Sequence, residues 1–284
     1  MKEPTTFGID LAKNIIQIAV LSNGKVKSNK AISPAAFKKM LVTYKPMKLV
    51  FEACAGAHYW ARFANGYDHS SMILPAQFVA GSRQGQKTDS NDAIACAVAG
   101  HHPNARPVAI KTEIQQAMQA VERTQQALTK QSTALNNMLI GFLFEFGIKI
   151  SKRSGELARC LPEILEDAEN GIPDCLRGTL FLSFEHYQDT RKRLADIEAQ
   201  LKQLVAENEA CRSLLALEGV GPIKALGLYL AIGDGHAFKN GRDAATCIGV
   251  TPKQHSTGGK ERAWNNLNIL TGLFAPDSTI SIVA

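Results

Sequence analysis

The first part of the chain alternates between apolar and polar side chains in a way that predicts three short β-strands. Phe7 to Leu11 and Ile15 to Leu21 are mostly apolar runs of strand length, and such runs between turn residues are typical of strands in a sheet. Asn23 and Gly24 follow them, and this pair tolerates the positive φ angles of a tight hairpin turn. Residues 5–32 are therefore expected to form a three-stranded meander.

Helix and strand patterns then alternate as far as residue 110. Ser33 and Pro34 suit the N-cap and the first position of a helix that continues to Tyr44. The remaining segments are strands at 48–52 and 71–74 and helices at 58–64 and 90–99. A meander followed by alternating strands and helices predicts a mixed sheet with helices packed on it. We therefore assign residues 1–110 to one α/β domain.

From Ile114 onward, apolar positions are spaced four and three residues apart, which is typical of one face of a long helix. The positions that follow this spacing are Ile114, Met118, Val121, Gln125, Leu128, Ser132, Leu135, Leu139, Phe142 and Phe146. A second stretch from Leu180 to Leu204 behaves in the same way. Residues 111–213 are expected to be a coiled-coil helical region, with helices that pair within the chain or between chains. A plain helical spacer, and an arm for dimerisation or for clamping nucleic acid, both fit this pattern.

A glycine-containing turn marks a third region that begins near Leu214. Gly219 and Gly221 lie between two helical patterns, as in a helix-hairpin-helix element. Backbone N–H groups at such a turn can bind a phosphate at the start of the following helix, whereas an ordinary tight turn between helices is the alternative. Residues 214–262 are predicted to be a small, mostly α-helical domain.

Charge is distributed unevenly along the chain. The 284 residues include 32 Lys and Arg and 26 Asp and Glu, which gives a net charge of +6. Residues 1–110 hold 13 basic and 6 acidic side chains, whereas the remainder holds 19 and 20. A basic first part indicates an anionic partner, and nucleic acid is the commonest such partner. An ordinary basic surface is the alternative.

Two absences from the sequence bear on where the protein works. We find neither a signal-like segment after Met1 nor an apolar run of the roughly 20 residues that a membrane helix needs. The six cysteines are scattered without a C-x-x-C pair, so neither zinc binding nor a disulfide framework is indicated. We expect a cytoplasmic protein with no membrane partner.

Four acidic residues stand out by their positions. Asp10 lies inside an apolar strand pattern, Glu52 ends another, and Asp89 and Asp92 lie three residues apart at the start of a helix. An isolated carboxylate in an apolar strand is costly, and residues three apart share a helix face. If the two strands are neighbours, the four carboxylates converge, and a divalent cation would relieve their repulsion. Mg²⁺ prefers such oxygen ligands, and paired ions assist phosphodiester displacement.

Each of these acids also has an ordinary explanation. Asp10 would then be a turn or cap residue, and Glu52 a charge at a strand end. Asp89 and Asp92 would simply favour a helix N-terminus. Taken together, the pattern of a strand Asp, a strand Glu and a helical Asp-x-x-Asp favours metal binding over these separate explanations.

Five separated motifs, taken in order, resemble those of a known family. The motifs are Gly8-Ile-Asp-Leu-Ala-Lys13, Val50-Phe-Glu-Ala53, Lys87-Thr-Asp-Ser-Asn-Asp-Ala93, Gly219-Val-Gly221 and Gly249-Val-Thr-Pro-Lys-Gln-His-Ser-Thr-Gly-Gly-Lys-Glu-Arg262. Together they resemble the DEDD insertion-sequence transposases, which are relatives of the Piv DNA invertases and are also described as bridge-RNA-guided recombinases. The resemblance covers residues 5–262. It implies a RuvC-like (RNase H-like) N-terminal domain, a coiled-coil insert and a C-terminal transposase domain.

The same resemblance implies an activity and a set of site residues. The protein would be a transposase or site-specific recombinase that cleaves and rejoins DNA with Mg²⁺, held by an acidic tetrad of Asp10, Glu52, Asp89 and Asp92. The family also uses a serine nucleophile, and the matching segment here is Ser256-Thr-Gly-Gly259. We assign the nucleophile to Ser256, although an alignment shifted by one residue would choose Thr257. A hydroxyl is a weak nucleophile until a base or a metal assists it.

The partners implied by the resemblance are DNA, a structured guide RNA and further copies of the chain in a dimer or tetramer. The setting would be the bacterial cytosol, with association to the nucleoid during activity. The residues we consider for nucleic-acid binding are Lys13, Lys87, Gly219, Gly221, Lys224, Lys253, Lys260 and Arg262. The last three would either hold phosphates or be solvated loop charges. The alternative function is a catalytically impaired remnant that still binds DNA or RNA.

The residues after Arg262 depart from the family pattern. A family member continues with a Gly-Ile-Thr/Ser-Lys-like segment and a helix that contains Tyr-Leu-Arg, and neither string follows here. Residues 263–266 and 271–277 can be encoded so that the next reading frame gives Leu-Gly-Ile-Thr and Arg-Gly-Tyr-Leu-Arg-Leu-Ile. We therefore expect residues 263–284 to be a frameshifted tail on a truncated C-terminal domain, and recombination by this chain to be weak or absent.

Overall fold

The computed structural model describes residues 5–151, 153, 155–233, 235, 238, 240–248, 253–257 and 260–264, and the chain divides into two units. For residues 253–257 and 260–264 it describes the backbone. Unit 1 consists of Met1–Gln115 and Gly233–Asn240, and unit 2 consists of Gln116–Ile232 and Gly241–Ala284.

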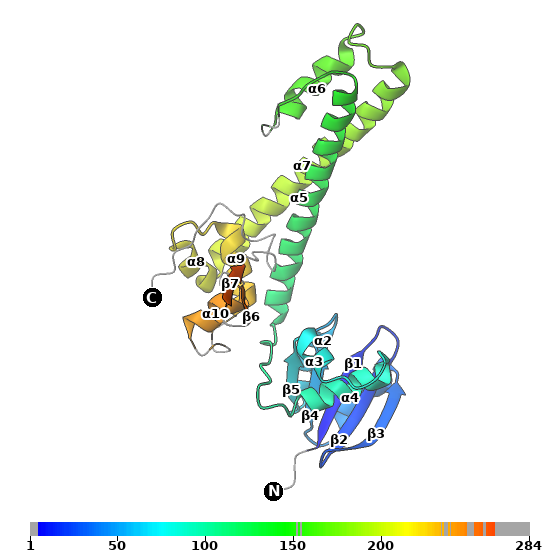
Figure 1. Cartoon of the computed structure of the whole chain (residues 1–284), viewed down its shortest axis with the longest axis vertical. Helices are drawn as coiled ribbons and strands as arrows, with labels where there is room; N and C mark the ends of the chain where they lie inside the picture. Colours follow the sequence, from blue (N-terminus) through cyan, green and yellow to red (C-terminus); the bar gives the residue numbers. More distant parts are fainter. Residues whose placement is uncertain are drawn as a thin grey trace. The chain divides into compact units, whose positions relative to one another are not determined.

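Unit 1 is built on a five-stranded sheet (Figure 1). Its strands are β1 (Thr6–Leu11), β2 (Ile16–Ser22), β3 (Lys25–Ile32), β4 (Lys48–Glu52) and β5 (Ser70–Leu74). They are arranged in the order β3-β2-β1-β4-β5, and β1 pairs antiparallel with β2 and parallel with β4. The predicted mixed sheet is confirmed, and Asp10 lies on its central strand.

Local sequence signals explain where the first elements turn and begin. Asn23 and Gly24 both have positive φ angles, of 51° and 68°, in the turn between β2 and β3, as the Asn-Gly pair predicts. Helix α1 (Pro34–Thr43) begins after Ser33, whose side chain accepts a hydrogen bond from the N–H of Ala36. The turn after β2 and the start of α1 therefore lie where the sequence predicts them.

Helices cover both faces of this sheet. On one face, Ile9, Phe51 and Ile73 form a core with α1 and α2 (Ala57–Asn65). On the other face, Val50 and Leu74 pack against α3 (Ala76–Gly81) and α4 (Asp89–Ala99). Because side chains alternate along a strand, Gly8 and Asp10 face α4 whereas Ile9 faces α1 and α2.

Unit 2 contains two long helices that pack on each other. Helices α5 (Glu113–Glu145) and α7 (Asp174–Glu207) have 33 and 34 residues. Their buried residues Leu139, Leu143 and Leu180 share a core with α6 (Glu156–Glu166). The two helices therefore pair within the chain. Throughout the part of the chain that the structure describes, helices lack the combination of length and apolar content that crossing a bilayer requires.

The apolar spacing predicted for α5 holds only in part. Met118 and Leu139 are buried as expected, but Ile114, Phe142 and Phe146 are exposed. Leu143, which the spacing did not select, is fully buried. The difference arises because α6 also packs on the end of α5, so that more than one face of this helix is covered there.

The last described elements of unit 2 surround a second core. Met118 and Leu201, from the start of α5 and the end of α7, pack there with α8 (Glu209–Leu215), α9 (Pro222–Ile232) and Ile248, which follows α10 (Gly241–Cys247). Strands β6 (Lys253–Thr257) and β7 (Lys260–Trp264) then pair antiparallel.

This hairpin corrects one of the two alternatives given for the last three basic residues, namely that they are charges in a loop. Lys253, Lys260 and Arg262 lie on β6 and β7. Two glycines between two strand-length runs are a hairpin signal, and Gly258-Gly259 supplied that signal in the sequence. Residues 263 and 264 of the expected frameshifted tail end β7, and residues 265–284 lie outside the described residues.

Candidate active site

The two strand acids lie side by side at the centre of the sheet of unit 1. Strands β1 and β4 are parallel neighbours, and their last paired residues are Ile9 and Phe51. Asp10 and Glu52 each come directly after these residues. Because equivalent positions on adjacent parallel strands have their side chains on the same face, both carboxylates face the side of the sheet that α4 covers.

Glycine permits α4 to approach this face closely. A Cβ atom on Gly8 would lie 2.0 Å from the carbonyl oxygen of Ala93 and 2.4 Å from the amide nitrogen of Ala97. At the other end of α4, a Cβ atom on Gly100 would lie 2.5 Å from Cγ2 of Val50. A side chain at Gly8 would therefore push the helix away from the sheet. The close approach brings the first turn of α4, with Asp89 and Asp92, toward Asp10.

The electrostatics of the four acids reflect this arrangement. Burial, followed by the negative charges of Asp89, Asp92 and Glu52, raises the pKa of Asp10 to about 6. Burial and the charge of Asp92 also raise the pKa of Glu52, while Lys87 and Arg83 act in the opposite direction. Each of the four predicted acids thus influences at least one of the others, so the structure brings them into one electrostatic cluster, which we call the acidic cluster.

Arg83 is part of this site, although the sequence motifs did not identify it. Its Nη1 atom lies 2.9 Å from Oδ1 of Asp92, and the two side chains are only 26% and 12% exposed. Asp92 therefore has a cationic partner on the segment between α3 and α4. Lys87, which was predicted to bind nucleic acid, is exposed on the same segment. The two cations place positive charge beside the acidic cluster.

The acidic cluster provides a donor set that suits Mg²⁺. Hard carboxylate oxygens are the ligands this ion prefers. The neighbouring thiols are poor candidates for a softer metal, because burial and the nearby carboxylates raise the pKa of Cys54 to about 11 and also raise that of Cys96. In the described part of the chain, no three His, Cys, Asp or Glu side chains converge tightly enough to hold one metal ion together.

The remaining predicted residues lie elsewhere. Lys13 is exposed in the turn between β1 and β2. Gly219, with a φ angle of +78°, and Gly221 lie in the turn between α8 and α9, where Nζ of Lys224 donates to the Gly219 carbonyl at 3.3 Å. On the hairpin of unit 2, Ser256 pairs with Glu261, and Thr257 pairs with Lys260.

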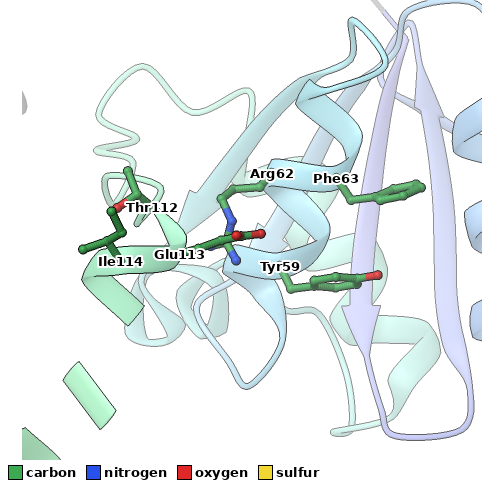
Figure 2. Close-up of a pocket in the computed structure, with 6 residues that line it drawn as sticks. All are labelled: Tyr59, Arg62, Phe63, Thr112, Glu113 and Ile114. Atoms are coloured by element: carbon green, nitrogen blue, oxygen red, sulfur yellow. The ribbon is translucent and has the colours of Figure 1, made fainter. Parts of the chain in front are cut away.

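A pocket that the sequence did not indicate lies beside α2 and the start of α5 (Figure 2). Its volume is about 450 Å³. It is lined by three residues of α2, by the first two residues of α5 and by the residue before α5, namely Tyr59, Arg62, Phe63, Glu113, Ile114 and Thr112. Helix α2 packs on the face of the sheet opposite α4. None of the four acids lines this pocket, so the two features are separate.

Two family models match the chain. The DEDD-type IS110 model, described as "Transposase", matches residues 7–147, and this range contains all four acids. The model described as "Transposase IS116/IS110/IS902 family" matches residues 211–268, and this range contains Ser256.

Curated relatives match over most of the chain. A "Probable family 20 transposase" of Pseudomonas aeruginosa is 33% identical over 260 residues, which is 91% of this chain and 77% of the relative. The transposase for insertion sequence element IS1111A of Coxiella burnetii is 31% identical over 262 residues, with 92% and 72% covered. The transposase for IS1328 of Yersinia enterocolitica is 33% identical over 261 residues, with 92% and 77% covered. These matches do not favour the alternative of a remnant that only binds nucleic acid.

Proposed function

This chain belongs to the IS116/IS110/IS902 family of transposases, and from that premise we propose how it cleaves and rejoins DNA. The acidic cluster of unit 1 would hold Mg²⁺ through Asp10, Glu52, Asp89 and Asp92. Ser256 on the hairpin of unit 2 would be the nucleophile. The domains would then act as a RuvC-like unit over residues 1–110, a coiled coil over 111–213 and a transposase domain over 214–262.

One observation supports the metal-binding part above the others. Carboxylates from β1, β4 and α4 come together on one face of the sheet, although they are spread over residues 10–92. Buried like charges are unfavourable unless a cation offsets them. Mg²⁺ bound there would stabilise the charge that develops on a phosphodiester under attack. The carboxylates would hold the ion, and Lys87 together with Arg83, which pairs with Asp92, would bind phosphate oxygens.

The covalent step that we propose uses the Ser256 hydroxyl. Its oxygen bonds to the phosphorus of a DNA phosphodiester, its proton passes to a base, and the bond to the leaving deoxyribose oxygen breaks as that oxygen takes up a proton. The strand is then joined to the protein through a phosphoserine. Attack by the hydroxyl of another strand end reverses the linkage and completes the transfer.

The partners follow from the same proposal. DNA phosphates would contact the basic residues of the family motifs, which are Lys13, Lys87, Lys253, Lys260 and Arg262, and also Lys224 just after the Gly219-Val-Gly221 motif. Backbone amides next to Gly219 and Gly221 would add contacts at a helix start. A structured guide RNA and one or more further copies of the chain would complete the assembly.

A covalent-adduct assay tests this proposal. The full chain is incubated with Mg²⁺, guide RNA and nicked suicide DNA, and the adduct is detected on a denaturing gel. We expect Ser256→Ala and Asp10→Asn to abolish it. The matched control is Asp68→Asn, because Asp68 is exposed, lies outside the acidic cluster and has a positive φ that Asn tolerates. An adduct that survives Ser256→Ala but disappears with Thr257→Ala would transfer the role to Thr257, and one that survives Asp10→Asn would refute the metal site.

A further inference from the structure

We propose that Asn29 is a positioning residue that fixes where the first turn of α4 holds Asp89 and Asp92 relative to Asp10. This inference rests on the proposed function of the acidic cluster. Asn29 lies on β3, which is an edge strand of the sheet, and it lies outside the family motifs quoted above. It acts through Ser90, the residue directly after Asp89.

The pairing of the strands places Asn29 on the same face as the acids. Asp10 pairs with Gln17 across β1 and β2, and Ala19, two residues further along β2, pairs with Asn29 on β3. Directly paired residues in antiparallel strands have their side chains on the same face. Asp10, Gln17 and Asn29 therefore form a row on the face that α4 covers, and α4 contacts all three of their strands.

A chain of short hydrogen bonds runs along this row and ends on α4. Nε2 of Gln17 donates to Oδ1 of Asn29 at 2.6 Å. Nδ2 of Asn29 donates to the backbone carbonyl of Ser90 at 3.0 Å and contacts Oγ of Ser90 at 2.7 Å. The amide of Asn29 thus uses both N–H donors and its acceptor, and the Ser90 carbonyl fixes its orientation because that group only accepts.

An amide suits this position better than the other side chains of similar size. Asp would lack the donors for the Ser90 carbonyl and would add a negative charge beside the acidic cluster. Leu would leave the amide of Gln17 without its acceptor. Only Asn, at this length, can accept from Gln17 and donate twice to Ser90.

The contact matters because the other side-chain hydrogen bonds that the structure describes at the start of α4 join residues close to it in sequence. Thr88 caps the N–H of Asn91, and Nδ2 of Asn91 donates to the carbonyl of Gln86. These bonds shape the turn but do not tie it to the sheet. The close approach at Gly8 involves Ala93 and Ala97, which follow the turn that bears the aspartates. Asn29 therefore supplies a direct bond from the sheet to the turn that bears both aspartates.

The proposal predicts a weaker metal site in Asn29→Ala. Mn²⁺ binding to the full chain is titrated by electron paramagnetic resonance, and amide hydrogen exchange of residues 89–92 is measured without metal. We expect about tenfold weaker Mn²⁺ binding, since groups that orient metal ligands usually contribute ten- to a hundredfold, and faster exchange confined to residues 89–92. The Mg²⁺ concentration for half-maximal strand cleavage should rise by a similar factor.

Matched variants separate positioning from folding. Lys30→Ala changes the adjacent exposed residue, whose side chain lies on the opposite face, and should leave Mn²⁺ binding unchanged. Gln17→Ala should act in the same direction as Asn29→Ala and add little to it in the double variant, because Gln17 acts through Asn29. If Asn29→Ala does not fold, Ser90→Ala keeps the carbonyl contact and removes only the hydroxyl, and we expect severalfold weaker binding.

The outcomes distinguish failure of this inference from failure of the proposed function. Mn²⁺ binding that is lost in Asp10→Asn but stays within twofold of the unmodified protein in Asn29→Ala and Ser90→Ala would overturn the role of Asn29 alone. A purely structural role would lower thermal stability without moving the Mn²⁺ affinity, and it would also overturn the inference. Mn²⁺ binding that persists in Asp10→Asn would refute the acidic cluster as the metal site, and the inference with it.

Discussion

The two faces of the sheet in unit 1 are packed by different means. Toward α1 and α2, large side chains such as Ile9 and Phe51 fill the space between sheet and helices. Toward α4, Gly8 lies directly beneath Ala93 and Ala97. Large residues hold a helix at a distance and exclude polar groups, whereas small residues admit the helix backbone to the sheet. The close packing is what allows acids on a helix to reach acids on strands.

The strongest way to break this comparison is Gly8→Ala. Its Cβ atom would lie 2.0 Å from a backbone oxygen of α4, so the helix must move or the unit must lose stability. We expect a loss of about 3 kcal/mol in the free energy of unfolding, the upper part of the usual range for overpacking. Urea denaturation measures it, with Trp60 as reporter in a Trp264→Phe background, since the chain has two tryptophans.

The control for Gly8→Ala is Gly81→Ala at the end of α3. Gly81 has open space around its Cβ position, so the same added methyl group should change stability by less than about 1 kcal/mol. If both substitutions lowered the free energy of unfolding equally, the lack of space for a Cβ atom between Gly8 and α4 would not limit stability. Gly8→Ala should also weaken Mn²⁺ binding, because it moves Asp89 and Asp92.

A smaller effect is expected from Arg83→Gln. The change leaves the buried carboxylate of Asp92 without its cationic partner. An unpaired, largely buried group costs about 1–3 kcal/mol, so without metal we expect a loss of about 1–2 kcal/mol. Thermal unfolding in EDTA and in Mg²⁺ checks this, and added Mg²⁺ should restore more stability to the variant than to the unmodified protein. An equal response to Mg²⁺ in both proteins would argue against Asp92 as a ligand.

The smallest change in stability is expected from Ile9→Val, on the face of the sheet that α1 and α2 cover. Ile9 lies between Gly8 and Asp10 in sequence, but its side chain packs toward α1 and α2. Ile9→Val should cost about 1 kcal/mol through the lost methyl group and leave Mn²⁺ binding unchanged. A change in metal affinity comparable to that of Gly8→Ala would show that the two faces are not independent.

Much of unit 1 could be predicted from local signals. The Asn23-Gly24 turn, the Ser33 cap and the apolar runs of the strands each depend on a few neighbouring residues. The convergence of Asp10 and Glu52 needed one further assumption, that their strands are neighbours, and the pairing of β1 with β4 meets it.

The rest depended on contacts between distant residues. Arg83 has no distinguishing pattern in sequence, because its partnership with Asp92 depends on how α3 leads into α4. Asn29 and Ser90 are 61 positions apart, although the polar Gln17 within an apolar strand was a signal that could have been followed. The hairpin of β6 and β7 was missed because the segment with Gly258-Gly259 was considered only as the match to the serine nucleophile, and the two glycines were not interpreted as a turn.

The antiparallel return of the long helices has a consequence for how the family can vary. Met118 near the start of α5 and Leu201 near the end of α7 lie in the same core. Everything between them leaves that core and comes back to it, so its length is not fixed by the residues that pack there. Insertions or deletions of matched helical turns in α5 and α7 would lengthen or shorten this projection by about 1.5 Å per residue pair. The length of the paired helices in unit 2 can therefore change while the core around Met118 and Leu201 stays the same.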